Sequence, residues 1–305
     1  SLEIYKKIYG LEHPKTALAL NDLGMTFLNN SKYKKAKSLL NQSIKIFEKI
    51  NRDNDTDLAY VLNNLGFLFL QSSEYEKAEP LLNRSLEIFK KNYGLEDEDT
   101  VTTINNLGML YFERDGYEKA EPLLRQSLEI YKKIYGLDNP EIVISLMNLG
   151  VLNFNLAQYQ KAEQYLNQAL EINKKNRIIN ENSAAIYNHL GLLKIELSQY
   201  DEAELLLIKS LEIRKSIYGS KHPAVAESLN NLGTLYADLG NSKKAENFLN
   251  KSLKINEEIY EFPNSLQATI LNNLGTLYED LGNSKKAENF LKKSLKISIK
   301  NEDIS

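Results

Sequence analysis

The sequence has no cysteine and no tryptophan, and its 305 residues include only three histidines and six prolines. Without cysteine the chain can form no disulfide framework, no thiolate zinc site and no thiol nucleophile. The histidines, His13, His189 and His222, are too scattered to suggest a metal site. We therefore expect no metal, no cofactor and, by default, a cytoplasmic location.

Long apolar runs and an excess of positive charge are also missing. No apolar run approaches the roughly 18 residues that cross a bilayer. The formal net charge of -3 and the pI near 5.8 lack the basic footprint by which a general nucleic-acid binder displaces phosphate counterions. The expected partners therefore include no membrane and no nucleic acid.

Catalytic patterns are equally absent. Glu79, Glu121 and Glu163 recur at one fixed position of a repeat, where we expect solvent-exposed carboxylates that interact favourably with a helix dipole. Other clustered acids lie in predicted loops and have no partner base. The sequence predicts that the chain is not an enzyme.

What the sequence does contain is a repeated Leu-Gly pair. The glycines are spaced by 42, 42, 42, 41, 42 and 42 residues, and an alanine follows twelve residues after each of them. These repeat glycines are Gly24, Gly66, Gly108, Gly150, Gly191, Gly233 and Gly275. A period of about 40 residues indicates a solenoid, in which each repeat buries its apolar face against its neighbours.

Each repeat predicts two helices. Around Gly66, apolar residues recur at helical spacing and predict a first helix, the A helix. Residues 75–93 predict a longer amphipathic second helix, the B helix. A glycine inside a helix costs about 1 kcal/mol relative to alanine, so we expect each A helix to press on its B helix where a methyl group would obstruct.

At these positions the chain resembles a known family. The residues that carry the likeness are Leu62, Leu65, Gly66, Phe69, Tyr75, Ala78, Leu82 and Ser85. Their spacing is similar to that of the tetratricopeptide repeat, in the 42-residue variant found in kinesin light chains and many bacterial proteins. The resemblance implies an all-α, right-handed α-solenoid of seven helix-turn-helix repeats, preceded by a partial helix. It also implies a non-catalytic scaffold that binds proteins or peptides.

The repeats predict the domain organisation. Residues 1–10 copy residues 127–136, so we expect 1–13 to be the end of a truncated repeat helix and the chain to be the recognition or sensor region of a larger protein. A single solenoid is expected over 14–305. Its predicted repeats are 14–55, 56–97, 98–139, 140–180, 181–222, 223–264 and 265–305.

The resemblance implies a concave groove lined by the A helices, and asparagines three and two residues before the repeat glycines are its predicted peptide clamp. They are Asn63, Asn64, Asn105, Asn106, Asn148, Asn188, Asn230, Asn231, Asn272 and Asn273. An amide donates and accepts at once, which suits the backbone of an extended peptide. Alternatively, some of these amides tie one A helix to the next.

The predicted groove changes character along the chain. Apolar residues such as Phe67, Phe112 and Phe154 line the early repeats, although contacts between A helices can consume part of this stripe. The late repeats carry acids in their place, namely Glu227, Asp238, Glu279 and Asp280. Apart from Lys194, basic residues are absent from this face. The predicted ligand is a peptide or helix with apolar anchors at one end and Lys or Arg at the other.

A structural role is the alternative. The last B helix carries Leu291, Leu295, Ile297 and Ile299, and only residues 301–305 follow to cover them. Solenoids normally need a polar terminal cap. Self-association through this uncapped C-terminal helix would make the chain a self-assembling solenoid that acts through its open ends or its convex face.

Overall fold

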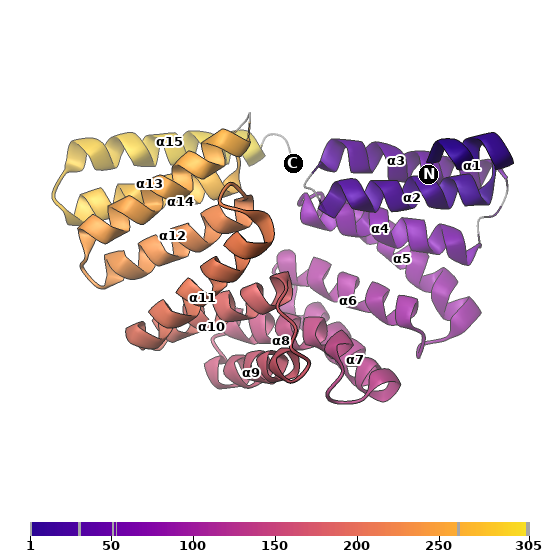
Figure 1. Ribbon diagram of the computed structural model, residues 1–305, viewed down its shortest axis with the longest axis horizontal. Coiled ribbons are helices and arrows are strands. Elements are labelled where there is room, and N and C mark those ends of the chain that lie inside the picture. Colours follow the sequence, from indigo (N-terminus) through magenta and orange to yellow (C-terminus); the bar gives the residue numbers. More distant parts are fainter. Residues whose placement is uncertain (1, 30–31, 51, 53, 261–262, 303–305) are drawn as a thin grey trace. The chain divides into compact units, whose positions relative to one another are not determined.

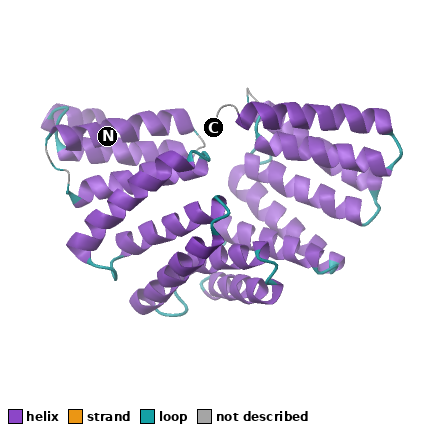
Figure 2. Ribbon diagram, turned by 180° about the vertical axis from the view of Figure 1, so that it is seen from behind, coloured by secondary structure: helices purple, strands orange, loops and turns teal. Residues whose placement is uncertain are grey.

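The computed structural model describes residues 2–29, 32–50, 52, 54–260 and 263–302, with only the backbone described for residues 300–302. Every regular element in these ranges is a helix, as Figure 2 shows in purple. The expected all-α fold is confirmed. Residue 1 of the predicted truncated helix and residues 303–305 of the predicted last repeat lie outside the described residues.

Seven A helices alternate with eight B helices (Figure 1). The A helices are α2 (Pro14–Asn29), α4 (Thr56–Gln71), α6 (Glu98–Glu113), α8 (Val143–Asn155, entered through the 3-10 turn Pro140–Ile142), α10 (Glu181–Glu196), α12 (Pro223–Asp238) and α14 (Ser265–Asp280). The B helices are α1 (Leu2–Tyr9), α3 (Tyr33–Lys49), α5 (Tyr75–Tyr93), α7 (Tyr117–Tyr135), α9 (Tyr159–Lys175), α11 (Tyr200–Tyr218), α13 (Ser242–Ile259) and α15 (Ser284–Glu302).

Local signals set the helix ends. Gly94 and Gly136 end α5 and α7 with φ of +86°, a left-handed conformation that glycine adopts without a steric penalty. The next A helix then starts on a side-chain cap. The carboxylate of Asp97 accepts hydrogen bonds from the N–H groups of Asp99 and Thr100, both at 3.1 Å. Each B helix therefore stops and each A helix restarts within a short loop.

The repeat glycines lie where the two helices of one repeat press together. A Cβ atom built on Gly66 would lie 2.7 Å from Cγ of Leu82, and one on Gly108 would lie 2.7 Å from Cδ2 of Leu124. Both leucines are fully buried. The predicted close approach of the A and B helices is confirmed, and it explains why glycine is kept at a helical position.

A buried serine adds a second tie within the repeat. Ser85 of α5 donates a hydrogen bond of 2.7 Å to the backbone carbonyl of Ala59 in α4. The same bond links Ser43 to Ala17 and Ser294 to Ala268, both at 2.7 Å. Because a buried hydroxyl needs a partner, this bond sets the register of the two helices.

The chain divides into two compact blocks, Ser1–Leu152 (the N-terminal block) and Asn153–Ser305 (the C-terminal block). In the first block α2, α4 and α6 pack side by side, and in the second α10, α12 and α14 do so. The division falls inside α8 and coincides with none of the predicted repeat boundaries. Those boundaries, and the single solenoid over 14–305, remain predictions.

Candidate functional site

The asparagines of neighbouring A helices are hydrogen-bonded to one another. In the N-terminal block, the second asparagine of each helix donates Nδ2 to Oδ1 of the first asparagine on the preceding helix. The pairs are Asn64 to Asn21 (2.9 Å), Asn106 to Asn63 (3.0 Å) and Asn148 to Asn105 (3.2 Å). The C-terminal block repeats the pattern in Asn231 to Asn188 (2.9 Å) and Asn273 to Asn230 (3.0 Å). These amides form an asparagine ladder that ties the repeats together.

The asparagine ladder determines how far each of the predicted clamp residues is buried. The first asparagines Asn63, Asn105, Asn188 and Asn230 are buried, as are Asn64, Asn106 and Asn148. Asn231 and Asn273 are half-buried, and Asn272 is exposed. The alternative reading, in which amides join one A helix to the next, describes these contacts. An amide has two N–H groups, and the ladder engages one from each second asparagine, so a role toward a peptide stays a prediction.

One face of each A helix forms a strip of four residues along the helix, in which Asn64, Asn106 and Asn148 are buried by the ladder and the other side chains are half-buried or exposed. Its positions are six and two residues before the repeat glycine and one and five residues after it, which share one helical face. In the N-terminal block this A-helix strip contains Tyr60, Asn64, Phe67 and Gln71 on α4, and Thr102, Asn106, Met109 and Glu113 on α6. In the C-terminal block it contains Ala185, His189, Leu192 and Glu196 on α10, Glu227, Asn231, Thr234 and Asp238 on α12, and Thr269, Asn273, Thr276 and Asp280 on α14.

Of the three predicted aromatic groove residues, only Phe67 lies in the strip. Phe112 is buried, with its ring centroid 5.8 Å from that of Tyr117. Phe154 is half-buried, with its ring centroid 6.0 Å from that of Tyr159. Both occupy the position one turn beyond the repeat glycine, so they face the start of the B helix, as the glycine does. We correct their placement accordingly: they belong to the packing between helices.

Three acids line the C-terminal edge of the strip in the C-terminal block. Asp238 and Asp280 are exposed there, with Glu279 beside Asp280. Glu196, which the sequence reasoning missed, occupies the equivalent position on α10. Burial and the charge of Glu196 raise the pKa of Asp238. A cation placed between these acids would relieve that repulsion.

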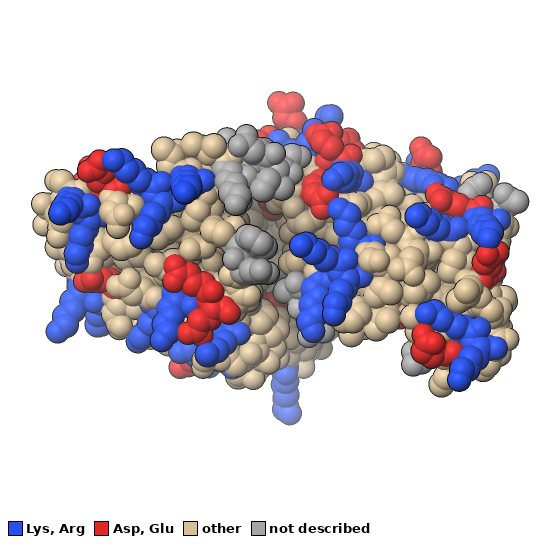
Figure 3. Space-filling model, turned by 90° about the horizontal axis from the view of Figure 1, so that it is seen from above, with Lys and Arg blue, Asp and Glu red and all other residues tan. Residues whose placement is uncertain are grey.

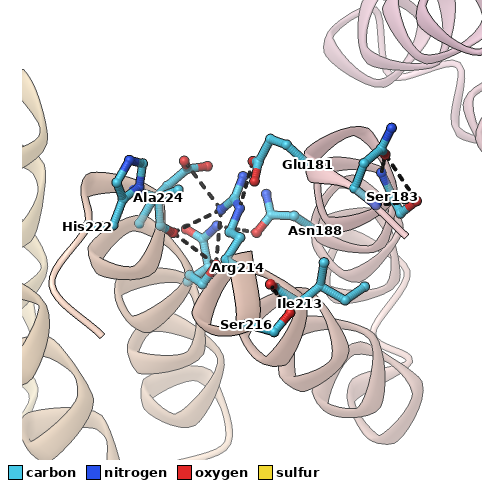
Figure 4. Close-up of polar contacts among 12 residues, drawn as sticks. Glu181, Ser183, Asn188, Ile213, Arg214, Ser216, His222 and Ala224 are labelled. Carbon is cyan, nitrogen blue, oxygen red and sulfur yellow. Dashed lines mark hydrogen bonds and ion pairs between the residues drawn. The ribbon is translucent and has the colours of Figure 1, made fainter. Parts of the chain in front are cut away.

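Glu227 lies apart from these acids. Its Oε2 is 3.4 Å from Nη1 of Arg214, a side chain only 5% exposed on α11. Figure 4 shows the Arg214 cluster, in which Nε donates to Glu181 (3.0 Å) and Nη1 donates to the carbonyl of Ala224 (3.1 Å) and to Ser228 (3.0 Å). Glu227 therefore helps to neutralise a buried arginine, while its side chain stays 44% exposed, so its predicted role in the acidic end remains a prediction.

A sequence signal for Arg214 exists, although it was missed. Twenty-three residues after the repeat glycine, the first three repeats carry Phe47, Phe89 and Tyr131, all buried. The fourth and sixth repeats carry Asn173 and Asn256 there. An arginine at a buried aromatic position indicates a polar cluster between repeats.

Several charged residues join successive repeats. Glu79, which is half-buried, accepts a hydrogen bond from the Tyr111 hydroxyl (2.9 Å) and pairs with Arg114 (2.6 Å). Lys194 lies 2.9 Å from Glu163 and 3.0 Å from Glu202. The expectation that Glu79 and Glu163 are solvent-exposed was wrong, because each faces a side chain of the following A helix. Lys194 is already neutralised.

The pKa of His189 is expected to make stability depend on pH. Burial, together with the positive charge of Arg214, lowers this pKa from 6.5 to about 4. Between these values the unfolded chain binds a proton that the folded chain does not, so stability falls as the pH drops from 6.5 toward 4. His189→Asn, which copies Asn148 and Asn231 at the equivalent position, should lose less stability on acidification.

Thermal melts of both proteins at about pH 7 and about pH 5 check this, with each kcal/mol of difference shifting Tm by about 2–4 °C. An equal fall in Tm for the two proteins would assign the acid sensitivity to other groups.

Among the described residues, no group of three or more His, Cys, Asp or Glu side chains is arranged to hold a metal ion. None of the helices described combines the length and apolar character needed to cross a membrane.

Comparison with solved structures gives several similar folds. A Rap protein complexed with Competence and Sporulation Factor has a TM-score of 0.71 at 14% identity, with 98% of this chain and 83% of that chain covered. The apo form of the quorum sensor NprR from B. thuringiensis also has a TM-score of 0.71, at 18% identity, covering 97% and 80%. BtubC (BKLC) from P. vanneervenii has a TM-score of 0.61 at 23% identity, covering 75% and 92%.

Comparison with family profiles is more direct. Among curated proteins the sequence has no significant match. Two profiles described as tetratricopeptide repeat match the chain, one at residues 1–49, 57–133, 99–175 and 182–258 and the other at 268–300. These matches cover most of the sequence, and they fall on the helix pairs described above. The chain belongs to the tetratricopeptide repeat family, in a form whose repeats are 41 or 42 residues apart.

Proposed function

We propose that this chain is a non-catalytic recognition or sensor region that binds a protein segment along the A-helix strip. The strip of the N-terminal block takes apolar anchors, and the strip of the C-terminal block takes Lys or Arg side chains. The observation that carries the proposal is the strip itself. It is a row of mostly half-buried and exposed side chains on adjacent helices, whose register the asparagine ladder holds.

The chemistry of the strip supports this ligand class. Tyr60 is 42% exposed on α4, and Phe67 and Met109 present half-buried apolar side chains beside it. In the C-terminal block Glu196, Asp238 and Asp280 offer carboxylates to cations. Similar folds include a Rap protein complexed with Competence and Sporulation Factor and the quorum sensor NprR, and both support a sensing role for an array of this kind.

Substitutions of the strip acids test the proposed binding more specifically than substitutions of the asparagines. Truncating Asn106 would orphan the buried Oδ1 of Asn63, at a cost of about 1–3 kcal/mol, so lost binding could reflect a loosened stack. Glu196→Gln, Asp238→Asn and Asp280→Asn keep the side-chain shape and remove only charge. The matched control removes three charges from the B helices of the same block, through Glu171→Gln, Asp201→Asn and Glu212→Gln.

Peptides selected by the wild-type chain from a random display library should be rich in Lys and Arg. The strip variant is expected to bind them about tenfold to hundredfold more weakly, since each exposed charge pair contributes about 0.5–1 kcal/mol. The control should bind as the wild type does, and both variants should keep the wild-type melting temperature. Equal affinity of the strip variant and the wild type, or selection without basic residues, would refute the proposal.

Self-association through the last B helix is the alternative function. Leu295 of α15 is 60% exposed, whereas Leu211, at the equivalent position of α11, is 7% exposed because α12 packs over it. Residues 303–305, which the sequence analysis placed beyond α15, lie outside the described residues. Assembly of this kind would make sedimentation depend on concentration, and the strip variant would assemble as the wild type does.

A further inference from the structure

A second candidate binding surface lies on the B helices of the last two repeats. A groove of about 440 Å³ opens between α13 and α15, above the start of α14. Leu253, Leu271, Phe290 and Ile297 form its apolar floor, and Lys293 and Lys296 stand on its α15 rim. All of these residues belong to the C-terminal block, and none belongs to the A-helix strip.

The two rim lysines occupy positions that vary among the repeats: Lys45 of the first repeat is equivalent to Lys296, and Arg84, Lys209 and Lys251 are equivalent to Lys293. Twenty-one residues after the repeat glycine, the second to fifth repeats carry glutamate, at Glu87, Glu129, Glu171 and Glu212. Lys296 and Lys254 replace that acid in the last two repeats. Three residues earlier, Lys293 stands where three of the other repeats carry glutamine. The fold accepts glutamate at the position of Lys296 and glutamine at the position of Lys293, so packing does not require lysine at either.

Among the described residues, the lysines of this rim have no carboxylate partner, whereas the nearby Glu257 and Glu258 each have a hydrogen-bond or ion-pair partner. Neither Lys293 nor Lys296 pairs with a carboxylate among the residues described, although Lys293 Nζ lies 5.9 Å from the centroid of the Phe290 ring. Glu257 on the opposite rim accepts a hydrogen bond from Gln267 (3.4 Å), and Glu258 pairs with Lys221 (2.8 Å). Figure 3 shows one face of the molecule, seen from above, on which Lys and Arg side chains (blue) are interspersed with Asp and Glu side chains (red).

We propose that this groove binds an acidic peptide segment that carries an aliphatic or aromatic anchor. The anchor fills the recess over Leu253 and Ile297, and its flanking carboxylates pair with Lys293 and Lys296. A recessed apolar floor suits a peptide side chain, whereas a flat bilayer would need protruding apolar residues and a nucleic acid would offer no aliphatic anchor. The site is independent of the A-helix strip and takes the opposite charge.

The test uses the whole chain with methyl-labelled Leu and Ile and the peptide Glu-Glu-Leu-Leu-Glu-Glu as probe. The peptide should cause saturable NMR shifts in the methyl groups of Leu253, Leu271 and Ile297. Lys293→Gln combined with Lys296→Glu, both residues found at these positions in other repeats, should weaken binding at least fivefold. Peptides with Ser-Ser in place of Leu-Leu, or Lys in place of Glu, should leave these methyl groups unshifted.

The matched control variant is Lys243→Gln combined with Lys285→Glu, which changes the net charge equally at exposed positions outside the groove. It should bind the probe as the wild type does. Equal weakening in both variants would assign the effect to overall charge and overturn the site. Absence of saturable shifts would overturn it too, as would the same methyl shifts with phosphatidylserine vesicles but not with the peptide. The strip acids are unchanged in all these proteins, so failure here leaves the proposed function untouched.

Discussion

Replacing Phe89 by alanine is expected to lower the free energy of local opening around α5 and α6 by about 3–5 kcal/mol. The Phe89 ring is 1% exposed and belongs to the main core cluster of the N-terminal block. Truncation removes its buried area and leaves a cavity between two repeats that the surrounding helices fill only in part. Hydrogen exchange resolved along the chain is the appropriate measurement, because a repeat array can open locally.

Phe89→Leu is the control for this prediction. It keeps most of the apolar volume and should cost only about 1–1.5 kcal/mol. In the alanine variant, the rate of amide hydrogen exchange should rise in α4, α5 and α6 and stay near wild-type values in the C-terminal block. An alanine variant within about 1 kcal/mol of the wild type would mean that the ring does not close this interface.

Replacing Arg214 by methionine is expected to destabilise α10, α11 and α12 by about 2–3 kcal/mol. The substitution keeps the apolar stem but leaves Glu181 and Glu227 facing each other without a cation. It also removes the donor to Ser228 and to the carbonyl of Ala224. The loss should be smaller than for a fully buried pair, because the two glutamate side chains are 35% and 44% exposed and water screens them in part.

A triple variant separates charge from packing in this cluster. Arg214→Met combined with Glu181→Gln and Glu227→Gln removes the uncompensated charges, so it should recover more than half of the lost stability. Thermal melts and hydrogen exchange of the single and triple variants provide the comparison. If the triple variant were no more stable than the single one, the cost would lie in packing around the arginine stem.

Part of the candidate site was readable in the sequence and part was not. Phe67 lies in the strip, because it falls on the helical face that points away from the B helix, and its role in binding remains a prediction. Phe112 does not lie in the strip, since one turn beyond the repeat glycine the helix still faces its partner. The acids Asp238 and Asp280 are exposed, as expected. Glu227 instead pairs with Arg214, which lies on another helix and cannot be inferred from the sequence pattern of α12.

The sequence by itself determined the repeat, its two helices and the close approach at the repeat glycines. These features depend on contacts within about 40 residues that recur seven times, so periodicity alone encodes them. Only the tertiary structure decided which asparagines bond to one another, which face of each A helix stays exposed and where Lys293 and Lys296 meet an apolar groove. Such contacts join side chains of different repeats. Which side chains meet depends on how the helices stack, and the sequence pattern of one helix does not contain that information.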